Sequence, residues 1–240
     1  PSRPGYLKTP LDQGKTPKMQ ASVLVALLDE LHIEKPIVFA YSAGGYVAYA
    51  LAIHYPERVR GLIMADAVSG NYVMPSQAGW LAQTLFMSNL GLKFINKMGA
   101  LFPKSVIANL LKTEGLFNSN QLQQRVTEIL SNNDKTQFIL ELSRLLSPYS
   151  LRKAGTDLDM QICSELPVSM ELEKITCPSF IVHGTHDADV LFYHGVSAVE
   201  KIVNAKHFWI NTGSHFCFWI SPSAEEAQQR AQEFINSFFA

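Results

Sequence analysis

Short apolar runs alternate along this chain with longer segments in which apolar residues recur at helical spacing. The β-prone runs predict strands at 37–40, 59–65, 178–184 and 206–211. Amphipathic patterns over 18–31 and 224–239 predict helices before the first run and after the last one. The apolar stripe expected on the first helix consists of Val23, Leu24, Leu27, Leu28 and Leu31.

The middle of the chain carries a different pattern. From about 68 to 172 the apolar clusters fit helical spacing only, so this stretch is predicted to be wholly helical. Strand and helix patterns alternate on either side of it, in 1–67 and 173–240. Such alternation favours a mostly parallel sheet covered by helices on both faces. The predicted fold class is α/β, with functional groups expected at the carboxyl ends of the strands.

The run 36–54 carries the clearest chemical signal. A β-prone stretch ends abruptly at Ser42 and a helix-prone stretch follows, an arrangement that presents a hydroxyl on a strained turn. Ala40 and Gly44 lie two positions on either side, and their small size predicts that strand and helix approach closely there. The N–H of Ala43 is expected to point toward an oxygen bound beside the serine, helped by the helix N-terminus.

The same run is also compatible with a buried helix start that happens to contain serine, or with part of a membrane span. Residues 37–53 carry no charge, and about 17 residues is close to the shortest length that crosses a bilayer. The glycine pair, the three tyrosines and the change from strand to helix pattern argue against a span.

Two later motifs follow predicted strands. Residues 183–190 have the pattern His-Gly-x-x-Asp-x-x-Val, which contains Asp187, and residues 213–216 have the pattern Gly-x-His-Phe, which contains His215. With the serine turn, these motifs resemble the α/β-hydrolase family, whose nucleophile turn is usually Gly-x-Ser-x-Gly. Alanine stands here in place of the first glycine.

The resemblance implies a catalytic triad of Ser42, Asp187 and His215, in the family's order of serine, acid and histidine. A serine hydroxyl is a weak nucleophile and needs an adjacent base, the role implied for His215. Asp187 would hold the imidazole tautomer and stabilise the imidazolium. The backbone N–H of Ala43 would be one oxyanion donor. No cofactor is implied.

Relatives often insert a helical cap between the sixth strand and the acid strand. The resemblance therefore implies an α/β-hydrolase core made of 1–67 and 173–240, and a helical cap at 68–172. Few charged residues occur in 68–100, so the expected small-molecule substrate has an apolar portion. Five cap residues are expected either to line the substrate pocket or to pack the cap against itself: Trp80, Phe86, Met87, Phe94 and Met98.

The segment before the nucleophile lacks one family feature. The second oxyanion donor usually comes from an upstream loop, often His-Gly-Gly-Gly, and no His-Gly pair precedes Ser42. Residues 1–9 resemble the loop that follows the fourth strand in relatives. We therefore expect an N-terminally incomplete sheet in which 37–40 forms an exposed edge. Such an edge favours poor folding or self-association.

Composition agrees with a globular enzyme core. The chain is 47% hydrophobic and 17% charged, and its 20 basic and 21 acidic residues leave a net charge of −1. Such a balance indicates neither nucleic-acid binding nor electrostatic attachment to a membrane. The three cysteines have no metal-binding spacing, which weakly favours a reducing, cytoplasmic compartment.

Other titratable residues are weaker candidates. Asp66 follows a predicted strand at a position that some relatives use for the triad acid, and Asp189 competes with Asp187. His183 and His186 flank the acid loop, but they lack the helical His-x-x-x-His spacing of zincins, so no metal site is expected. His54 is expected to lie at a helix C-terminus. Cys217 is expected to be a packed small hydrophobe.

The sequence thus predicts a serine hydrolase that cleaves an ester, an amide or an activated carbon–carbon bond through an acyl-enzyme. One alternative is a transferase, lyase or cofactor-free peroxidase with the same fold. Another is a catalytically silent binding module, an interpretation that the missing oxyanion loop favours.

Overall fold

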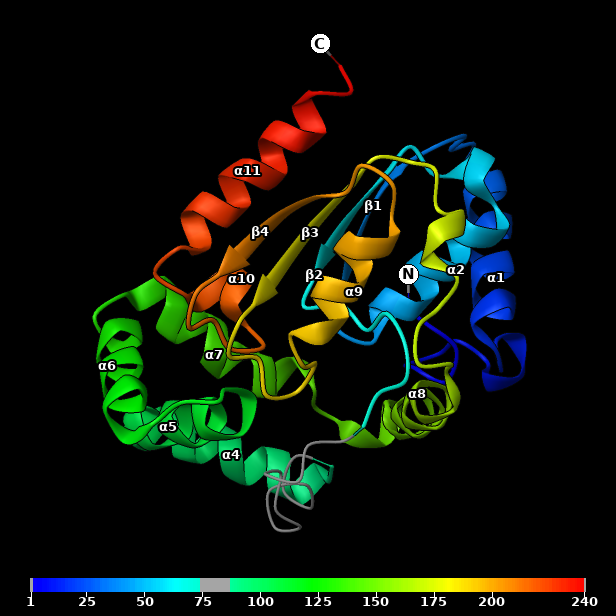
Figure 1. Ribbon diagram of the computed structural model, residues 1–240. Helices are drawn as coiled ribbons and strands as arrows, with labels where there is room; N and C mark the ends of the chain where they lie inside the picture. The colour runs from blue at the N-terminus through cyan, green and yellow to red at the C-terminus, as the bar shows by residue number, and fades with distance from the viewer. Residues whose placement is uncertain (1, 74–86, 240) are drawn as a thin grey trace.

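The computed structural model describes residues 2–73 and 87–239, and its centre is a parallel four-stranded sheet (Figure 1). The strands pair in chain order, and each predicted strand is present, so the α/β class is confirmed. Because all four point the same way, the residues that follow them gather at one edge. The strands are β1 (Ile37–Tyr41), β2 (Gly61–Ala65), β3 (Ser179–Gly184) and β4 (Lys206–Ile210).

Successive strand residues face opposite sides of the sheet and enter two separate cores. Leu62 and Met64 of β2 belong to one core, whereas Ile63 and Ala65 belong to the other. Helices cover both sides, as the pattern of alternating strands and helices predicts. The first side is covered by α1 (Pro17–Glu30), α2 (Gly44–His54) and α9 (Tyr193–Lys201), the second by α10 (Cys217–Ile220) and α11 (Ala224–Asn236).

Helix α1 differs from its prediction at its carboxyl end. Its first turn is capped by the Thr16 hydroxyl, which accepts a hydrogen bond from the N–H of Met19 at 3.2 Å. Ala21 is buried and Leu24 packs against the core. Leu31, expected on the apolar stripe, is 56% exposed. The helix ends at Glu30, so Leu31 lies outside it and faces solvent.

The long segment between β2 and β3 is helical wherever it forms regular structure among the described residues. Its helices lie beyond the carboxyl ends of the strands (Figure 1). Three of them, α5, α6 and α7, surround a third core that contains Ile107, Ile129 and Ile139, and α4 packs against α5 and α7. The helices of this segment are α4 (Asn89–Leu101), α5 (Pro103–Glu114), α6 (Ser119–Leu130), α7 (Asn133–Leu145) and α8 (Lys153–Glu165).

Helix α8 packs differently from the other four. Leu158 and Ile162 enter the same core as α2 and the sheet. Asp159 is buried and forms an ion pair with Arg3, whose Nη1 lies 2.7 Å from Oδ1. This helix therefore links the start of the chain to the main core. The division into a core and a cap over 68–172 stays a prediction.

Strand β1 lies at one end of the four-stranded order, with β2 as its neighbour. Phe39 is 47% exposed, although its ring lies 5.5 Å from that of Phe218. The predicted edge position of 37–40 is thus confirmed for the part of the chain that the structure describes, whereas self-association stays a prediction. None of the helices described here combines the length and apolar character needed to cross a bilayer.

Candidate active site

Three side chains that follow three different strands meet at the carboxyl edge of the sheet. Ser42 follows β1, Asp187 follows β3 and His215 follows β4. The Nε2 atom of His215 lies 3.0 Å from the Ser42 hydroxyl oxygen, and its Nδ1 atom lies 2.9 Å from Oδ2 of Asp187. The structure therefore brings together the three residues that the sequence motifs predicted.

The backbone at Ser42 has the strained conformation expected of a sharp strand-to-helix turn. Its φ is 53°, in the left-handed region that non-glycine residues rarely adopt. The Ser42 carbonyl accepts hydrogen bonds from the N–H of Gly45 at 2.9 Å and of Val68 at 3.0 Å. These two contacts hold the turn in place between β1 and the segment after β2.

The close approach predicted at Gly44 is found one residue further on. A Cβ at Gly44 would meet only the Cβ of Ala40, at the ordinary distance of 4.0 Å. A Cβ at Gly45 would lie 2.7 Å from both the nitrogen and the oxygen of Val68. The tight contact is therefore between α2 and the segment after β2, a pairing that the local sequence does not reveal.

The Ala43 N–H lies at the start of α2, directly after Ser42. No backbone or side-chain acceptor within residues 2–73 and 87–239 takes a hydrogen bond from it. Helix N-termini carry partial positive charge. An unengaged amide at such a point can donate to a substrate oxygen beside Ser42, as the sequence predicted.

His215 is 3% exposed and is held through its backbone. Its N–H donates to the Glu114 carbonyl at 3.0 Å, and its own carbonyl accepts from the Tyr41 hydroxyl at 2.9 Å. Burial alone would lower the pKa of His215. The negative charges of Asp187 and then Asp189 outweigh that effect and raise this pKa well above its usual range.

Asp187 is 1% exposed, and both its oxygens have partners. Oδ1 accepts hydrogen bonds from the N–H groups of Asp189 and Val190, each at 2.9 Å, and Oδ2 faces His215. Burial opposes ionisation, but the positive charge of His215 and the side-chain hydrogen bonds with His183 and His215 lower the pKa of Asp187 below its usual value. The carboxylate is thus held charged in one orientation.

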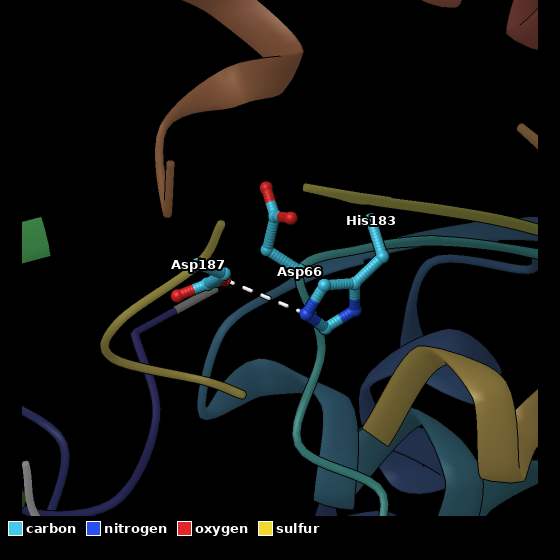
Figure 2. A group of neighbouring side chains, drawn as sticks. All are labelled: Asp66, His183 and Asp187. Carbon is cyan, nitrogen blue, oxygen red and sulfur yellow. Dashed lines mark ion pairs between the residues drawn. The ribbon is translucent and has the colours of Figure 1, made fainter. Parts of the chain in front are cut away.

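A sealed cluster lies behind Asp187 and consists of Asp66, His183 and Cys217 (Figure 2 draws the first two with Asp187). Oδ1 of Asp66 accepts from the N–H of Gly184 at 2.9 Å, and the Cys217 thiol lies 3.4 Å from both oxygens of Asp66. His183 Nε2 lies 2.8 Å from the Val190 carbonyl and 3.5 Å from Oδ2 of Asp187. Asp66 therefore lies beside Asp187, the acid that contacts Nδ1 of His215.

Ligand atoms of Asp66, His183 and Asp187 all lie within 4.8 Å of one another, a spacing that could hold a metal ion. However, backbone N–H groups and His215 already bind Oδ1 of Asp66 and both oxygens of Asp187, and Oδ2 of Asp66 faces the Cys217 thiol. His186, the other histidine considered for a metal, instead lies 3.1 Å from the Thr185 hydroxyl and stacks on Phe117. The hydrogen bonds of the cluster favour a structural role, in which it supports the loop that carries Asp187.

Asp189 approaches the opposite nitrogen of the same imidazole. Its Oδ2 lies 3.3 Å from His215 Nε2, the atom that also faces Ser42. Its Oδ1 accepts a hydrogen bond from the Tyr72 hydroxyl at 2.5 Å. The sequence treated Asp189 as a competitor of Asp187, whereas the structure gives the two acids different positions around one ring.

A cavity of about 370 Å³ opens in front of Ser42 and His215. It is mostly apolar, with side chains from α4, α5 and α7 on its far side. Glu114 is a charged lining residue that no sequence motif indicated. The described residues that line it are Tyr41, Ser42, Ile95, Val106, Leu110, Glu114, Ile139, Leu142, Leu145, Leu146, Asp189, His215 and Phe216.

Of the five cap residues named from the sequence, the three that the structure describes are not among the described lining residues. Met87, Phe94 and Met98 are outside the set, and Phe94 is 55% exposed. Trp80 and Phe86 lie outside the described residues. Helical spacing indicates that a position is apolar, but the rotation and packing of each helix decide which position faces the cavity.

Two residues given structural roles lie as predicted. His54 is the last residue of α2 and is exposed, at the end where a cation is favoured. Cys217 is fully buried in the core on the α10 and α11 side of the sheet. Its thiol also lies close to Asp66, a contact that the prediction of a packed small hydrophobe does not include.

Known proteins resemble this chain over nearly its whole length. The family described as "alpha/beta hydrolase fold" matches residues 2–222. A solved α/β-hydrolase fold protein from Nakamurella multipartita is 35% identical, with a TM-score of 0.89 over 97% of this chain and 80% of its own. The uncharacterized hydrolase YcgS of Bacillus subtilis is 28% identical over 99% of this chain and 81% of its own length.

A more distant relative from Cupriavidus pinatubonensis bears the name 2-hydroxy-6-oxononadienedioate/2-hydroxy-6-oxononatrienedioate hydrolase. It is 24% identical over 90% of this chain and 68% of its own length. The chain belongs to the α/β-hydrolase fold family, and it is an α/β-hydrolase enzyme.

Proposed function

We propose that this protein is a serine hydrolase that cleaves a carboxylic ester through Ser42, His215 and Asp187. The observation that carries the proposal is the continuous chain of two contacts, 3.0 Å from the Ser42 hydroxyl to His215 Nε2 and 2.9 Å from His215 Nδ1 to Asp187. Nucleophile, base and orienting acid need this connectivity. The strained backbone at Ser42 adds support, because it presents the hydroxyl at the cavity.

In the first half of the reaction, the Ser42 oxygen attacks the carbonyl carbon of the ester while its proton moves to His215 Nε2. The tetrahedral intermediate then collapses, the carbon–oxygen bond to the alcohol breaks, and His215 returns the proton to the departing oxygen. An acyl-enzyme on Ser42 remains. In the second half, water loses a proton to His215 and attacks this acyl group, which releases the acid and restores the serine.

Each neighbouring group has a defined part in this scheme. Asp187 keeps the proton on Nδ1, so that Nε2 can accept from Ser42, and it stabilises the imidazolium that forms. The N–H of Ala43 donates to the oxyanion, a contact for which each donor is typically worth ~3 kcal/mol. The position of this amide beside Ser42, with no acceptor among the described residues, supports the role.

We further propose that α4 to α7 act as a cap over this site, within the boundaries 68–172 given by the sequence. Side chains from α4, α5 and α7 line the far side of the cavity, while Ser42 and His215 line the near side. The apolar character of the lining supports a small-molecule substrate with an apolar portion.

Hydrolysis of p-nitrophenyl hexanoate tests the proposed function. We expect Ser42-dependent release of p-nitrophenol, with kcat lowered by ~10³-fold or more in Ser42→Ala. Ser22→Ala is the matched control, because Ser22 is exposed on α1 and bonds only the Met19 carbonyl. If the Ser42→Ala variant, shown by circular dichroism to be folded, retains the activity of the parent protein, the proposed function is wrong.

A further inference from the structure

Among the residues that the structure describes, the lining of the cavity beside Ser42 has two acidic side chains and no basic one except the triad histidine. Glu114 and Asp189 line it, and the remaining lining residues are uncharged. No lysine or arginine of the described ranges 2–73 and 87–239 lines this cavity. Residues 74–86, whose positions the structure does not describe, contain no lysine, arginine or histidine in the sequence. Asp189 and, once it ionises, Glu114 therefore give the substrate chamber its negative charge.

Glu114 is fixed where it is by long-range backbone contacts. It ends α5, and its carbonyl accepts hydrogen bonds from the N–H groups of Ala188 and His215, at 3.2 and 3.0 Å. Its neighbour Gly115 pairs with Asp187 in an isolated β-bridge. The last turn of α5 is thus attached to both loops that carry the triad acid and base.

The two acids also affect one another. Burial first, and then the negative charge of Asp189, raise the pKa of Glu114 to about 8. Glu114 therefore ionises only as the pH passes about 8, and at any pH above the ordinary range of carboxyl groups a carboxylate entering this cavity would meet the charge of Asp189 and the same poorly solvated surroundings. A positive charge would instead stabilise both carboxylates.

We propose that this cavity selects esters whose acyl chain is neutral or carries an ammonium group, and rejects esters whose acyl chain ends in a carboxylate. The proposal rests on the proposed serine hydrolase activity and adds the substrate class. It sets this chain apart from the Cupriavidus pinatubonensis relative, whose name specifies a dioate, a substrate with two carboxylates. Like charges brought together in a site of low polarity weaken binding and so change specificity.

Three p-nitrophenyl esters of equal acyl length test this selection: hexanoate, 6-aminohexanoate and the mono-ester of adipate. For the wild-type protein we expect kcat/KM for adipate to be at least ~30-fold below that for hexanoate. We expect the value for 6-aminohexanoate to equal or exceed that for hexanoate. The ratio between esters is the readout, because a general loss of activity cancels from it.

Glu114→Gln is the decisive variant, since it keeps the shape and removes the ionisable group. At pH 9, above the pKa of Glu114, we expect the hexanoate-to-adipate ratio to fall at least ~threefold. Glu57→Gln removes the same formal charge from an exposed position before β2, at the opposite end of the strands, and should leave the ratio unchanged. Continued hydrolysis of hexanoate by Glu114→Gln shows that the variant is folded.

The outcomes separate the two proposals. Ser42-dependent hydrolysis of hexanoate and adipate at rates within threefold of each other would overturn the charge selection and leave the hydrolase in place. An unchanged ratio in Glu114→Gln at pH 9 would also overturn it. Absence of Ser42-dependent hydrolysis for all three esters would overturn both.

Discussion

The two sides of His215 carry the same chemical group in different surroundings. Behind the ring, Asp187 and Asp66 are at most 1% exposed, and backbone N–H groups bind their oxygens. In front, the side chain of Asp189 is 30% exposed, and Glu114 lines the open cavity. A sealed carboxylate can be fixed in one orientation, whereas one that borders a cavity can respond to what enters it. Environment therefore assigns different tasks to chemically equal acids.

The largest effect expected from this comparison is on turnover. In Asp187→Asn, the amide oxygen can still accept hydrogen bonds from the N–H groups of Asp189 and Val190. The NH₂ group of the new side chain then faces His215 Nδ1. The ring must then carry its proton on Nε2 and cannot accept one from Ser42. We expect kcat for hexanoate hydrolysis to fall by ~10⁴-fold.

Asp189→Asn is the matched control for that measurement, because it makes the same change on the cavity side of the same ring. We expect it to lower kcat far less, by roughly tenfold at most. Equal losses in the two variants would show that the two sides of the ring do not differ in function. A larger loss in Asp189→Asn would assign the triad acid to the wrong residue.

The second effect concerns stability on the sealed side. Burial first, and then the charge of Asp187, raise the pKa of Asp66 from 3.8 to about 7. A raised folded-state pKa favours folding while the group is protonated, and that contribution is lost as pH rises from about 4 through 7. The side chain of Asp66→Asn does not ionise, so the variant does not lose this stability as the pH rises. Its amide oxygen can still accept the hydrogen bond from the Gly184 N–H.

We therefore expect the Tm of Asp66→Asn, relative to the wild-type protein, to be higher at pH 8 than at pH 5 by at least ~3 °C. Calorimetry at the two pH values measures it. Asp12→Asn, at an exposed position, should show no such change. A relative Tm that is lower at pH 8 would mean that the sealed Asp66 stabilises the fold as a carboxylate.

The smallest effect belongs to the pH profile. The charge of Asp189 helps to raise the pKa of His215, the base that must lose its proton before it can act. In Asp189→Asn we expect the acid limb of kcat/KM for hexanoate to move to lower pH, since this pKa falls. A limb that stays in place or moves upward would show that the contact at Nε2 does not affect the base.

The sequence predicted the parts of this site that are encoded locally. Asp187 and His215 lie in short motifs directly after strands, and Ser42 lies between a strand pattern and a helix pattern. Backbone geometry fixes where such residues appear, because parallel strands end at one edge. Hydrophobic periodicity predicted the strands, the two flanking helices and the helical middle segment, because strands and helices each place apolar residues at regular intervals.

The sequence did not predict what depends on contacts between distant segments. Glu114 reaches the site because the end of α5 binds the backbone of the acid and histidine loops, about 74 and 101 residues further along the chain. The tight packing at Gly45 depends on Val68, which follows the next strand. Neither contact leaves a periodic or motif signal near the residue concerned.

The most direct test of the central claim is the mass of the protein after reaction with a fluorophosphonate, a reagent that phosphonylates an activated serine. We expect a single adduct on Ser42 in the wild-type protein, none in Ser42→Ala, and labelling that is slowed at least ~100-fold in His215→Ala. A folded wild-type protein that stays unlabelled at Ser42, or labels as fast without His215, would contradict it.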